Sequence, residues 1–138
     1  AAPATLTAPF TTTAQYETIA QLIADALANG GISGPGAGGQ AIVFTQQFAA
    51  VQADMGGHKY AQALGDAQSF ISHVQAQSSK KVTTSIARTF QLDALLVYHN
   101  ALCLAGAAGQ ITPATAAADY TFYSNLVASL GGTVLPPC

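Results

Sequence analysis

The chain has 138 residues, enough for one domain and too few for two of ordinary size. Half of the residues are apolar but only 7% are charged, against roughly 25% in an ordinary soluble domain. The formal net charge of −2 excludes a basic nucleic-acid-binding surface and a polybasic membrane anchor. The high apolar content excludes a disordered chain, and no apolar run reaches the roughly 18 residues of a membrane span.

The two ends of the sequence indicate an exported protein. The chain begins at Ala1-Ala2-Pro3-Ala4 without a methionine, as a chain does after removal of a signal peptide, so we expect secretion. Cys103 and Cys138 are the two cysteines, and a disulfide between them would tie the C-terminal tail to the body of the domain. The alternative is a cytosolic protein with two free thiols.

The first half of the chain is predicted to form an arm and two helices. Residues 1–11 contain two prolines and no helical period, which predicts an extended arm. A first helix is predicted from Thr12 or Thr13 to the stop at residues 29–31, and a glycine-rich loop over residues 30–39. A second helix is predicted over residues 40–55, ended by two glycines.

Three more helices are predicted in the second half. The third covers residues 59–77, and the fourth runs from Thr83 or Thr84 to Leu104. Because the fourth is apolar on nearly every side, we expect other helices to surround it. The fifth opens at Thr112-Pro113, a capping threonine followed by a proline at the first helical position, and a non-helical tail follows over residues 131–138.

These elements predict one all-α domain over residues 1–138. The expected fold is an antiparallel bundle of about five helices around the apolar helix 83–104, with the tail tied by the disulfide. No segment shows the strict alternation of a strand beside a hairpin turn, so no sheet is predicted.

Residues 44–102 resemble FIMAH, a helical module that occurs as an accessory piece in secreted bacterial proteins. The likeness rests on GDAQSFI (residues 65–71) and VQAQSSKKV (residues 74–82): a Phe-Ile pair, a valine three residues on, and a lysine before an apolar residue that leads into the next helix. The resemblance implies a non-catalytic accessory or binding role and transfers no catalytic residues. The additional first and last helices and the terminal cysteine depart from the module and favour a free-standing protein.

Motifs for cofactors and metals are weak. Residues 34–39 match G-x-G-x-x-G, but a helix and not a strand precedes them, so a flexible linker is predicted in place of a dinucleotide site. His58, His73 and His99 lie on or beside three different predicted elements without metal-ligand spacing, and we expect His73 and His99 to be partly buried core residues. No cofactor and no metal are predicted.

The sequence contains no recognised catalytic motif, and one acidic residue requires separate consideration. G-x-S-x-G does not occur, and the acidic residues are not grouped by their spacing. Asp93 is the exception, because it falls inside the apolar fourth helix, where an unpaired carboxylate is costly. It is expected to pair with Arg88, a lysine, a hydroxyl or His99, or to face a water-filled cavity.

Two sets of residues are candidates for binding. A cavity between alanine-rich helices beside the fourth helix would suit an apolar ligand, and its predicted residues are Phe90, Asp93, Val97, Tyr98, His99, Tyr120 and Tyr123. The polar segment between the second and third helices is a candidate contact loop, with Asp54, His58, Lys59 and Tyr60. The alternative interpretations are core packing for the first set and a solvated turn for the second.

Three functions are therefore open. The leading hypothesis is a secreted, non-catalytic helical protein that binds a fatty acid or another apolar small molecule, or adsorbs to a hydrophobic surface. The second is a structural or cell-wall subunit that self-associates, because few charges oppose association. The third is a small effector or hydrolase that uses a His/Asp pair such as His99 and Asp93. Nucleic acid is not expected as a partner.

Overall fold

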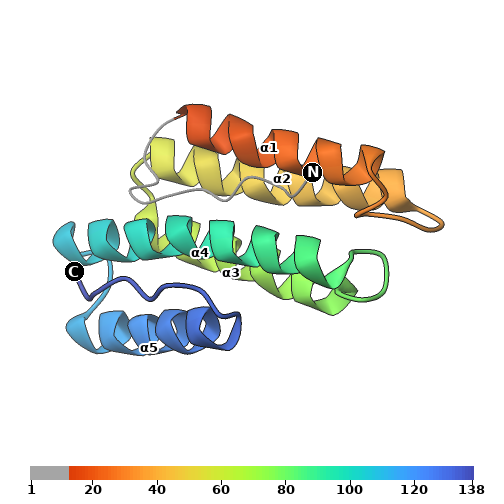
Figure 1. Cartoon of the computed structure of the whole chain (residues 1–138). Coiled ribbons are helices and arrows are strands. Elements are labelled where there is room, and N and C mark those ends of the chain that lie inside the picture. The colour runs from red at the N-terminus through yellow and green to blue at the C-terminus, as the bar shows by residue number, and fades with distance from the viewer. Residues whose placement is uncertain (1–12) are drawn as a thin grey trace.

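The computed structural model describes residues 13–138, so the extended arm predicted over residues 1–11 lies outside the described residues. The described part of the chain consists of five helices joined by loops and contains no strand, which confirms the all-α prediction (Figure 1). The helices are α1 (Thr13–Ala28), α2 (Ala37–Gly56), α3 (Tyr60–Gln77), α4 (Thr84–Ala107) and α5 (Pro113–Ser129). None of these helices has the length and hydropathy needed to cross a bilayer.

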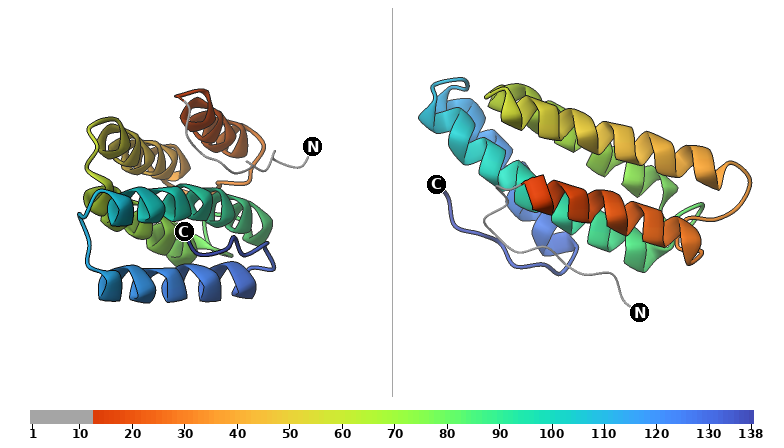
Figure 2. Two further views of the ribbon diagram at one scale, coloured as in Figure 1. Left: turned by 90° about the vertical axis from the view of Figure 1, so that its left-hand side faces the viewer. Right: turned by 90° about the horizontal axis from the view of Figure 1, so that it is seen from above.

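The helices pack antiparallel in three levels, with α4 at the centre. Helices α1 and α2 lie on one side, α3 and α4 form the middle, and α5 lies against α4 on the opposite side (Figures 1 and 2). Helix α4 contacts α1, α3 and α5. No residue of α4 between Thr89 and Ala105 is exposed. The prediction of a central apolar helix is confirmed.

Aromatic rings from three helices fill the core between α2, α3 and α4. Phe44 lies edge-on to Phe70 and to Phe90, with ring centroids 5.9 and 6.3 Å apart, and Phe48 lies edge-on to Phe70 at 5.2 Å. Each of the four rings is at most 3% exposed. Edge-on pairs of this kind add about 1 kcal/mol each to the free energy gained from burial, so this cluster anchors α4 to the α2–α3 pair.

Two threonines cap helices, and Thr112 is the cap that the sequence predicts. The hydroxyl of Thr83 accepts a hydrogen bond from the Ile86 amide, and the hydroxyl of Thr112 accepts one from the Thr115 amide. Pro113 occupies the first position of α5. Each cap satisfies an amide that has no partner inside the helix, which typically stabilises a helix by about 1 kcal/mol.

The boundaries of two helices differ from prediction. Helix α2 begins at Ala37, three residues before the predicted start, because Gly36 adopts a left-handed conformation (φ 79°) and its carbonyl already accepts from the Gln40 amide at 2.9 Å. The loop therefore ends at residue 36, and the last part of the predicted linker is helical. Helix α4 continues past Leu104 to Ala107, because Gly106 is tolerated in its last turn.

The glycine-rich loop pairs with the loop between α3 and α4. Ile32 and Val82 form an isolated antiparallel bridge, and both side chains are at most 1% exposed. The Ser33 amide donates to the Lys81 carbonyl at 2.7 Å, and the Thr83 amide donates to the Gly31 carbonyl at 2.9 Å. These bonds join the end of α1 to the start of α4.

Candidate functional site

The C-terminal tail, residues 131–138, runs back along α4 and α5 without helical structure (Figure 1). At its start, Nε of Arg88 donates to the Leu130 carbonyl at 2.6 Å. At its end, Cys138 forms a disulfide with Cys103 of α4, and the two Cα atoms are 5.3 Å apart. The predicted disulfide is confirmed, and it holds the tail across the α4–α5 pair.

Three aromatic side chains bind the middle of the tail. Tyr120 donates its hydroxyl proton to the Leu135 carbonyl at 2.6 Å, and the hydroxyl of Tyr123 accepts from the Leu135 amide at 3.0 Å. His99 donates from Nε2 to the Pro136 carbonyl at 2.8 Å. The rings also pack together, with centroids 5.0 Å apart for His99 and Tyr123 and 5.7 Å apart for the two tyrosines. We call His99, Tyr120 and Tyr123 the aromatic clamp.

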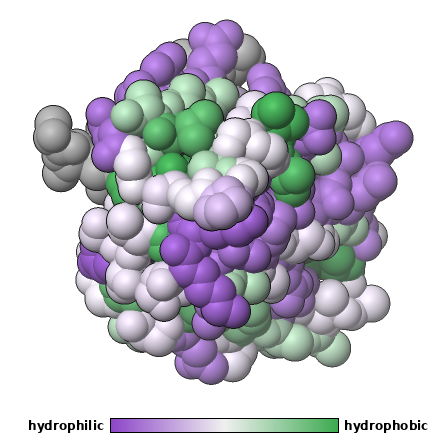
Figure 3. Space-filling model, turned by 90° about the vertical axis from the view of Figure 1, so that its right-hand side faces the viewer, coloured by the Kyte–Doolittle hydropathy of each residue, from purple (hydrophilic) through white to green (hydrophobic). Residues whose placement is uncertain are grey.

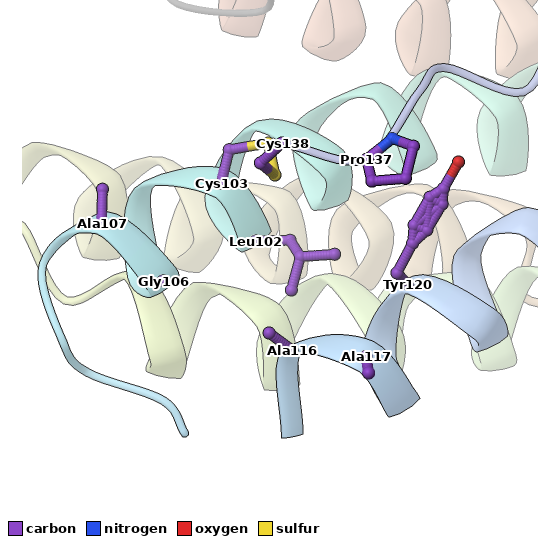
Figure 4. Close-up of a pocket in the computed structure, with 9 residues that line it drawn as sticks. All are labelled: Leu102, Cys103, Gly106, Ala107, Ala116, Ala117, Tyr120, Pro137 and Cys138. Atoms are coloured by element: carbon purple, nitrogen blue, oxygen red, sulfur yellow. A yellow bond between two sulfur atoms is a disulfide. The ribbon is translucent and has the colours of Figure 1, made fainter. Parts of the chain in front are cut away.

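An apolar groove of about 680 Å³ lies between the C-terminal end of α4, the first turns of α5 and the end of the tail. Figure 4 shows the disulfide, Pro137 and Tyr120 around Leu102. No side chain that lines the groove is charged, and the groove is partly open to solvent. Its walls are formed by Leu102, Cys103, Gly106, Ala107, Ala116, Ala117, Tyr120, Pro137 and Cys138.

Several of the residues that line the groove are small. Gly106 and Ala107 of α4 and Ala116 and Ala117 of α5 contribute no more than a methyl group each to its walls. A volume between 300 and 1,000 Å³ with few polar groups is typical of small-molecule sites. The groove therefore has the volume of a small-molecule site and largely apolar walls.

The seven residues predicted to bind a ligand occupy different places. Tyr120 lines the groove, and His99 and Tyr123 bind the tail beside it. The other four are at most 2% exposed and lie inside the bundle: Phe90, Asp93, Val97 and Tyr98. The groove lies nearer the end of α4 than these four residues, so they shape its surroundings and do not line it.

Tyr98 connects the core to α5. Its ring packs against Phe122 with centroids 5.4 Å apart, and its hydroxyl donates a hydrogen bond to the carboxylate of Asp119. Burial raises the pKa of Asp119, and the bond from Tyr98 partly offsets this. Burial also raises the pKa of Tyr98. The spacing of the acidic residues gave no sign that Asp119 would serve as an interhelical partner.

Neither ring nitrogen of His99 faces the predicted acid. Nε2 bonds the Pro136 carbonyl, and Nδ1 lies 4.0 Å from Sγ of Cys103. Asp93 is 1% exposed within α4. Arg88, its first proposed partner, donates to the carbonyls of Leu130 and Gly131 at the end of α5. The structure thus gives His99 a role in holding the tail.

The candidate contact loop is hydrogen-bonded to a residue of the loop between α4 and α5, which lies at the same end of the bundle (Figure 1). Gln110 donates to the His58 carbonyl at 2.7 Å and accepts from the Ala61 amide at 3.1 Å. The exposed His58 has a left-handed backbone (φ 58°), and its ring stacks on Tyr60 at 5.8 Å. Lys59 is also exposed, so the loop presents these side chains to solvent; its role as a contact surface stays a prediction.

Asp54, predicted as part of the same loop, is buried at the end of α2 instead. It is 9% exposed, and its pKa is raised to about 6, first by burial and then by a hydrogen bond and repulsion from Asp66. A carboxyl that holds its proton more tightly favours the neutral form, so this pair is a pH-sensitive feature of the α2–α3 junction.

A second apolar groove, of about 400 Å³, lies between α1 and α2. Ile42 is 58% exposed on its rim, and Leu27 and Val43 are also exposed nearby. Figure 3 shows the side of the molecule that is at the right in Figure 1. Apolar patches lie on its upper half, at the level of α1 and α2. The sequence patterns predicted an apolar helix face here but not that part of it remains uncovered.

His73 is a structural residue, as predicted, with more partners than expected. Gln40 donates to its Nε2 at 3.0 Å, and its Nδ1 donates to Gln47 at 3.1 Å, while its ring packs edge-on to Phe44 at 5.0 Å. Both ring nitrogens are therefore satisfied by α2. Two glutamines seven residues apart lie on one helix face, and this spacing was the available signal.

Comparison of the chain with protein-family models, with curated proteins and with solved structures finds no match. The resemblance of residues 44–102 to FIMAH stays a prediction.

Proposed function

We propose that this chain is a secreted, non-catalytic helical protein that binds an apolar ligand of the fatty-acid type in the groove beside α4. The observation that carries the proposal is the groove itself: about 680 Å³ in volume, with walls free of charged side chains. Apolar surface in the groove is in contact with water. When a ligand covers it, binding gains about 25 cal/mol for each Å² of apolar surface buried.

The chemistry of the walls favours a chain-like apolar ligand over a charged one. Tyr120 is the lining residue with a polar side-chain group, and its hydroxyl already donates to the Leu135 carbonyl. A carboxylate head would find no cation among the lining residues, so it would stay in solvent while the hydrocarbon lies in the groove. Shape and burial would then set affinity.

Three further features support a secreted binding protein. The disulfide between Cys103 and Cys138 is of a kind that persists in oxidising compartments such as the extracellular space. The resemblance of residues 44–102 to an accessory module of secreted proteins implies the same setting. The low charge, 7% of residues, suits adsorption to apolar material.

Displacement of a fluorescent fatty acid tests the proposal. Gly106 lies in the groove wall, so Gly106→Phe is expected to fill the groove and to weaken binding at least about ten-fold, or about 1.4 kcal/mol. The matched control is Gly65→Phe, because Gly65 is also an exposed helical glycine with no atom within 4 Å of an added Cβ, but lies on α3. Equal binding by both variants, or no binding by the wild type, would refute the assignment.

A second variant of the groove beside α4 tests the proposal independently, in case Gly106→Phe does not fold. Ala117→Leu on α5 enters the groove from the opposite wall, and Ala118→Leu places the same side chain one position further, on an exposed residue outside the groove. Circular dichroism confirms that each variant folds. Weakened binding in the first and unchanged binding in the second would locate the ligand between α4 and α5.

Self-association is a second candidate function, favoured by the groove between α1 and α2. The exposed Ile42 and Leu27 would be covered if a second copy of the chain packed there. Sedimentation velocity at rising concentration tests this, with Ile42→Glu expected to abolish any dimer and Gln62→Glu, at an exposed position on α3, to leave it unchanged. A wild-type monomer at every concentration would exclude this function.

A further inference from the structure

Three potential metal ligands meet where the tail joins α4. His99 and Cys103 are four residues apart, so their side chains share one face of the helix. The disulfide brings Cys138 to the same face. One ring nitrogen of His99 and the two Sγ atoms all lie within 4.8 Å of one another. Nδ1 of His99 is 4.0 Å from Sγ of Cys103.

The tail sets the tautomer of the histidine. A carbonyl oxygen only accepts hydrogen bonds, so the 2.8 Å contact from Nε2 to the Pro136 carbonyl places the ring proton on Nε2. The lone pair of the neutral ring is then on Nδ1, the nitrogen that lies 4.0 Å from Sγ of Cys103. An outer N–H bound to a backbone carbonyl is the usual arrangement for a histidine that ligates a metal.

We propose that, after reduction of the disulfide, His99, Cys103 and Cys138 bind one Zn²⁺ ion. Reduction by a dithiol breaks the S–S bond: two electrons and two protons pass to the sulfurs, and the dithiol becomes a disulfide. The metal then displaces one proton from each thiol, and both protons go to solvent. Two thiolates and an imidazole leave the fourth position of a tetrahedral zinc open for water or another ligand.

The geometry requires small adjustments only. Zinc bonds of about 2.0–2.3 Å place neighbouring ligand atoms of a tetrahedral site roughly 3.5 Å apart. The three ligand atoms already lie within 4.8 Å, and Cys138 is in the non-helical tail, where the backbone can shift without breaking a helix. The tail is then attached to α4 in one of two ways. The disulfide cross-links it under oxidising conditions, and the zinc ion links it under reducing conditions.

The test uses the full chain, reduced with a phosphine that becomes the phosphine oxide while water supplies the oxygen and the two thiol protons. Co²⁺ is the spectroscopic probe and Zn²⁺ the competitor. We expect one Co²⁺ per reduced chain, with thiolate-to-cobalt charge transfer, the intense visible bands of tetrahedral Co²⁺, and release of two protons per metal. The oxidised chain is expected to show none of these signals, because its sulfurs are bonded to each other.

Variants identify the ligands. His99→Gln keeps an N–H donor for the Pro136 carbonyl but lacks the imidazole, and it is expected to bind Co²⁺ at least about ten-fold more weakly. Cys138→Ser is expected to lose most of the charge-transfer intensity. His73→Gln is the control, because His73 contacts α2 and lies outside the cluster, so its affinity is expected to match the wild type. Equal affinity in His99→Gln, an octahedral spectrum, or binding by the oxidised chain would overturn the proposal.

Folding of the reduced chain is followed at the same time. If reduction loosens the fold, circular dichroism is expected to show recovery of helix when one equivalent of Zn²⁺ is added, and a higher melting temperature than without metal. A reduced chain that Zn²⁺ neither refolds nor stabilises would also overturn the proposal.

Discussion

The hydroxyl of Tyr123 lies 3.0 Å from the amide nitrogen of Leu135 and accepts its hydrogen bond. Tyr123 is 1% exposed and packs under the tail, so this phenol is a buried polar group whose partner is the backbone of a non-helical segment. Tyr120 completes the arrangement by donating to the carbonyl of the same residue. Both polar groups of one tail residue are thus satisfied by side chains of α5.

Removal of the Tyr123 hydroxyl is expected to destabilise the tail. Tyr123→Phe leaves the Leu135 amide without its acceptor, which costs about 1–3 kcal/mol where the amide stays buried. We expect a lower melting temperature and faster hydrogen exchange at Leu135. Tyr60→Phe is the control, because Tyr60 stacks on His58 at the α2–α3 junction and its substitution is expected to leave the tail unchanged. Unchanged exchange at Leu135 would show that this hydrogen bond does not hold the tail.

The pair Asp54 and Asp66 is expected to make stability depend on pH. The Asp54 pKa rises from 3.8 to about 6 on folding, chiefly through burial, so the folded state holds this proton more tightly than the unfolded state. The stabilisation from protonation is therefore complete below about pH 4 and is lost as the pH rises through about 6. The melting temperature is expected to fall over this window, although so few titratable groups otherwise predict a flat profile.

Asp54→Asn tests that pH dependence, because the amide mimics the neutral acid. The variant is expected to melt at about the wild-type temperature at pH 4 and a few degrees higher at pH 7, if the penalty is about 1 kcal/mol. The exposed Glu17→Gln serves as control and is expected to leave the slope unchanged. A wild-type melting temperature that rises between pH 4 and pH 7 would contradict the assignment.

A side chain at Gly132 is expected to destabilise the fold. An added Cβ would lie 2.6 Å from Cδ2 of Leu92 and 3.1 Å from Cγ1 of Val127, so Gly132→Ala would push the start of the tail away from α4 and α5. Overpacking of this kind costs about 1–3 kcal/mol. Gly65→Ala, where nothing lies within 4 Å, is expected to stabilise α3 by up to about 1 kcal/mol. Chemical denaturation compares the two, and a stable Gly132→Ala would refute the close packing.

The bond between Tyr98 and Asp119 is expected to couple α4 to α5. Asp119→Ala removes the acceptor of a hydroxyl whose residue is 1% exposed, which costs about 1–3 kcal/mol, whereas Tyr98→Phe removes the need for an acceptor. In a double-mutant cycle, Asp119→Ala is therefore expected to cost less in the Tyr98→Phe background. Additive effects of the two substitutions would mean that the side chains do not interact.

The sequence predicted those features that depend on local patterns. Helical spacing of apolar residues located all five helices, the sequence Thr112-Pro113 marked the start of α5, and the all-round apolar character of residues 83–104 predicted the central position of α4. Each of these signals is carried by neighbouring residues and by chemistry that acts within one or two helical turns.

The site was harder to predict because it depends on small residues, which contribute little to a periodic hydrophobic pattern. The groove is formed by Gly106, Ala107, Ala116 and Ala117, whose small side chains carry little hydrophobic signal, and by the place where the tail crosses them. The partners of His99 and Tyr123 are backbone atoms of that tail, and backbone atoms leave no trace in a sequence. Phe90 of α4, predicted from the sequence to be a ligand-binding residue, belongs to the core.

Because α5 lies wholly between Cys103 and Cys138, the disulfide encloses it in a covalent ring. Hydrolysis of any single peptide bond inside that ring leaves both fragments joined, so one cut by an external protease would not release α5. Helix α5 is thereby retained even when its backbone is broken once, and two cuts within the ring are needed to excise it.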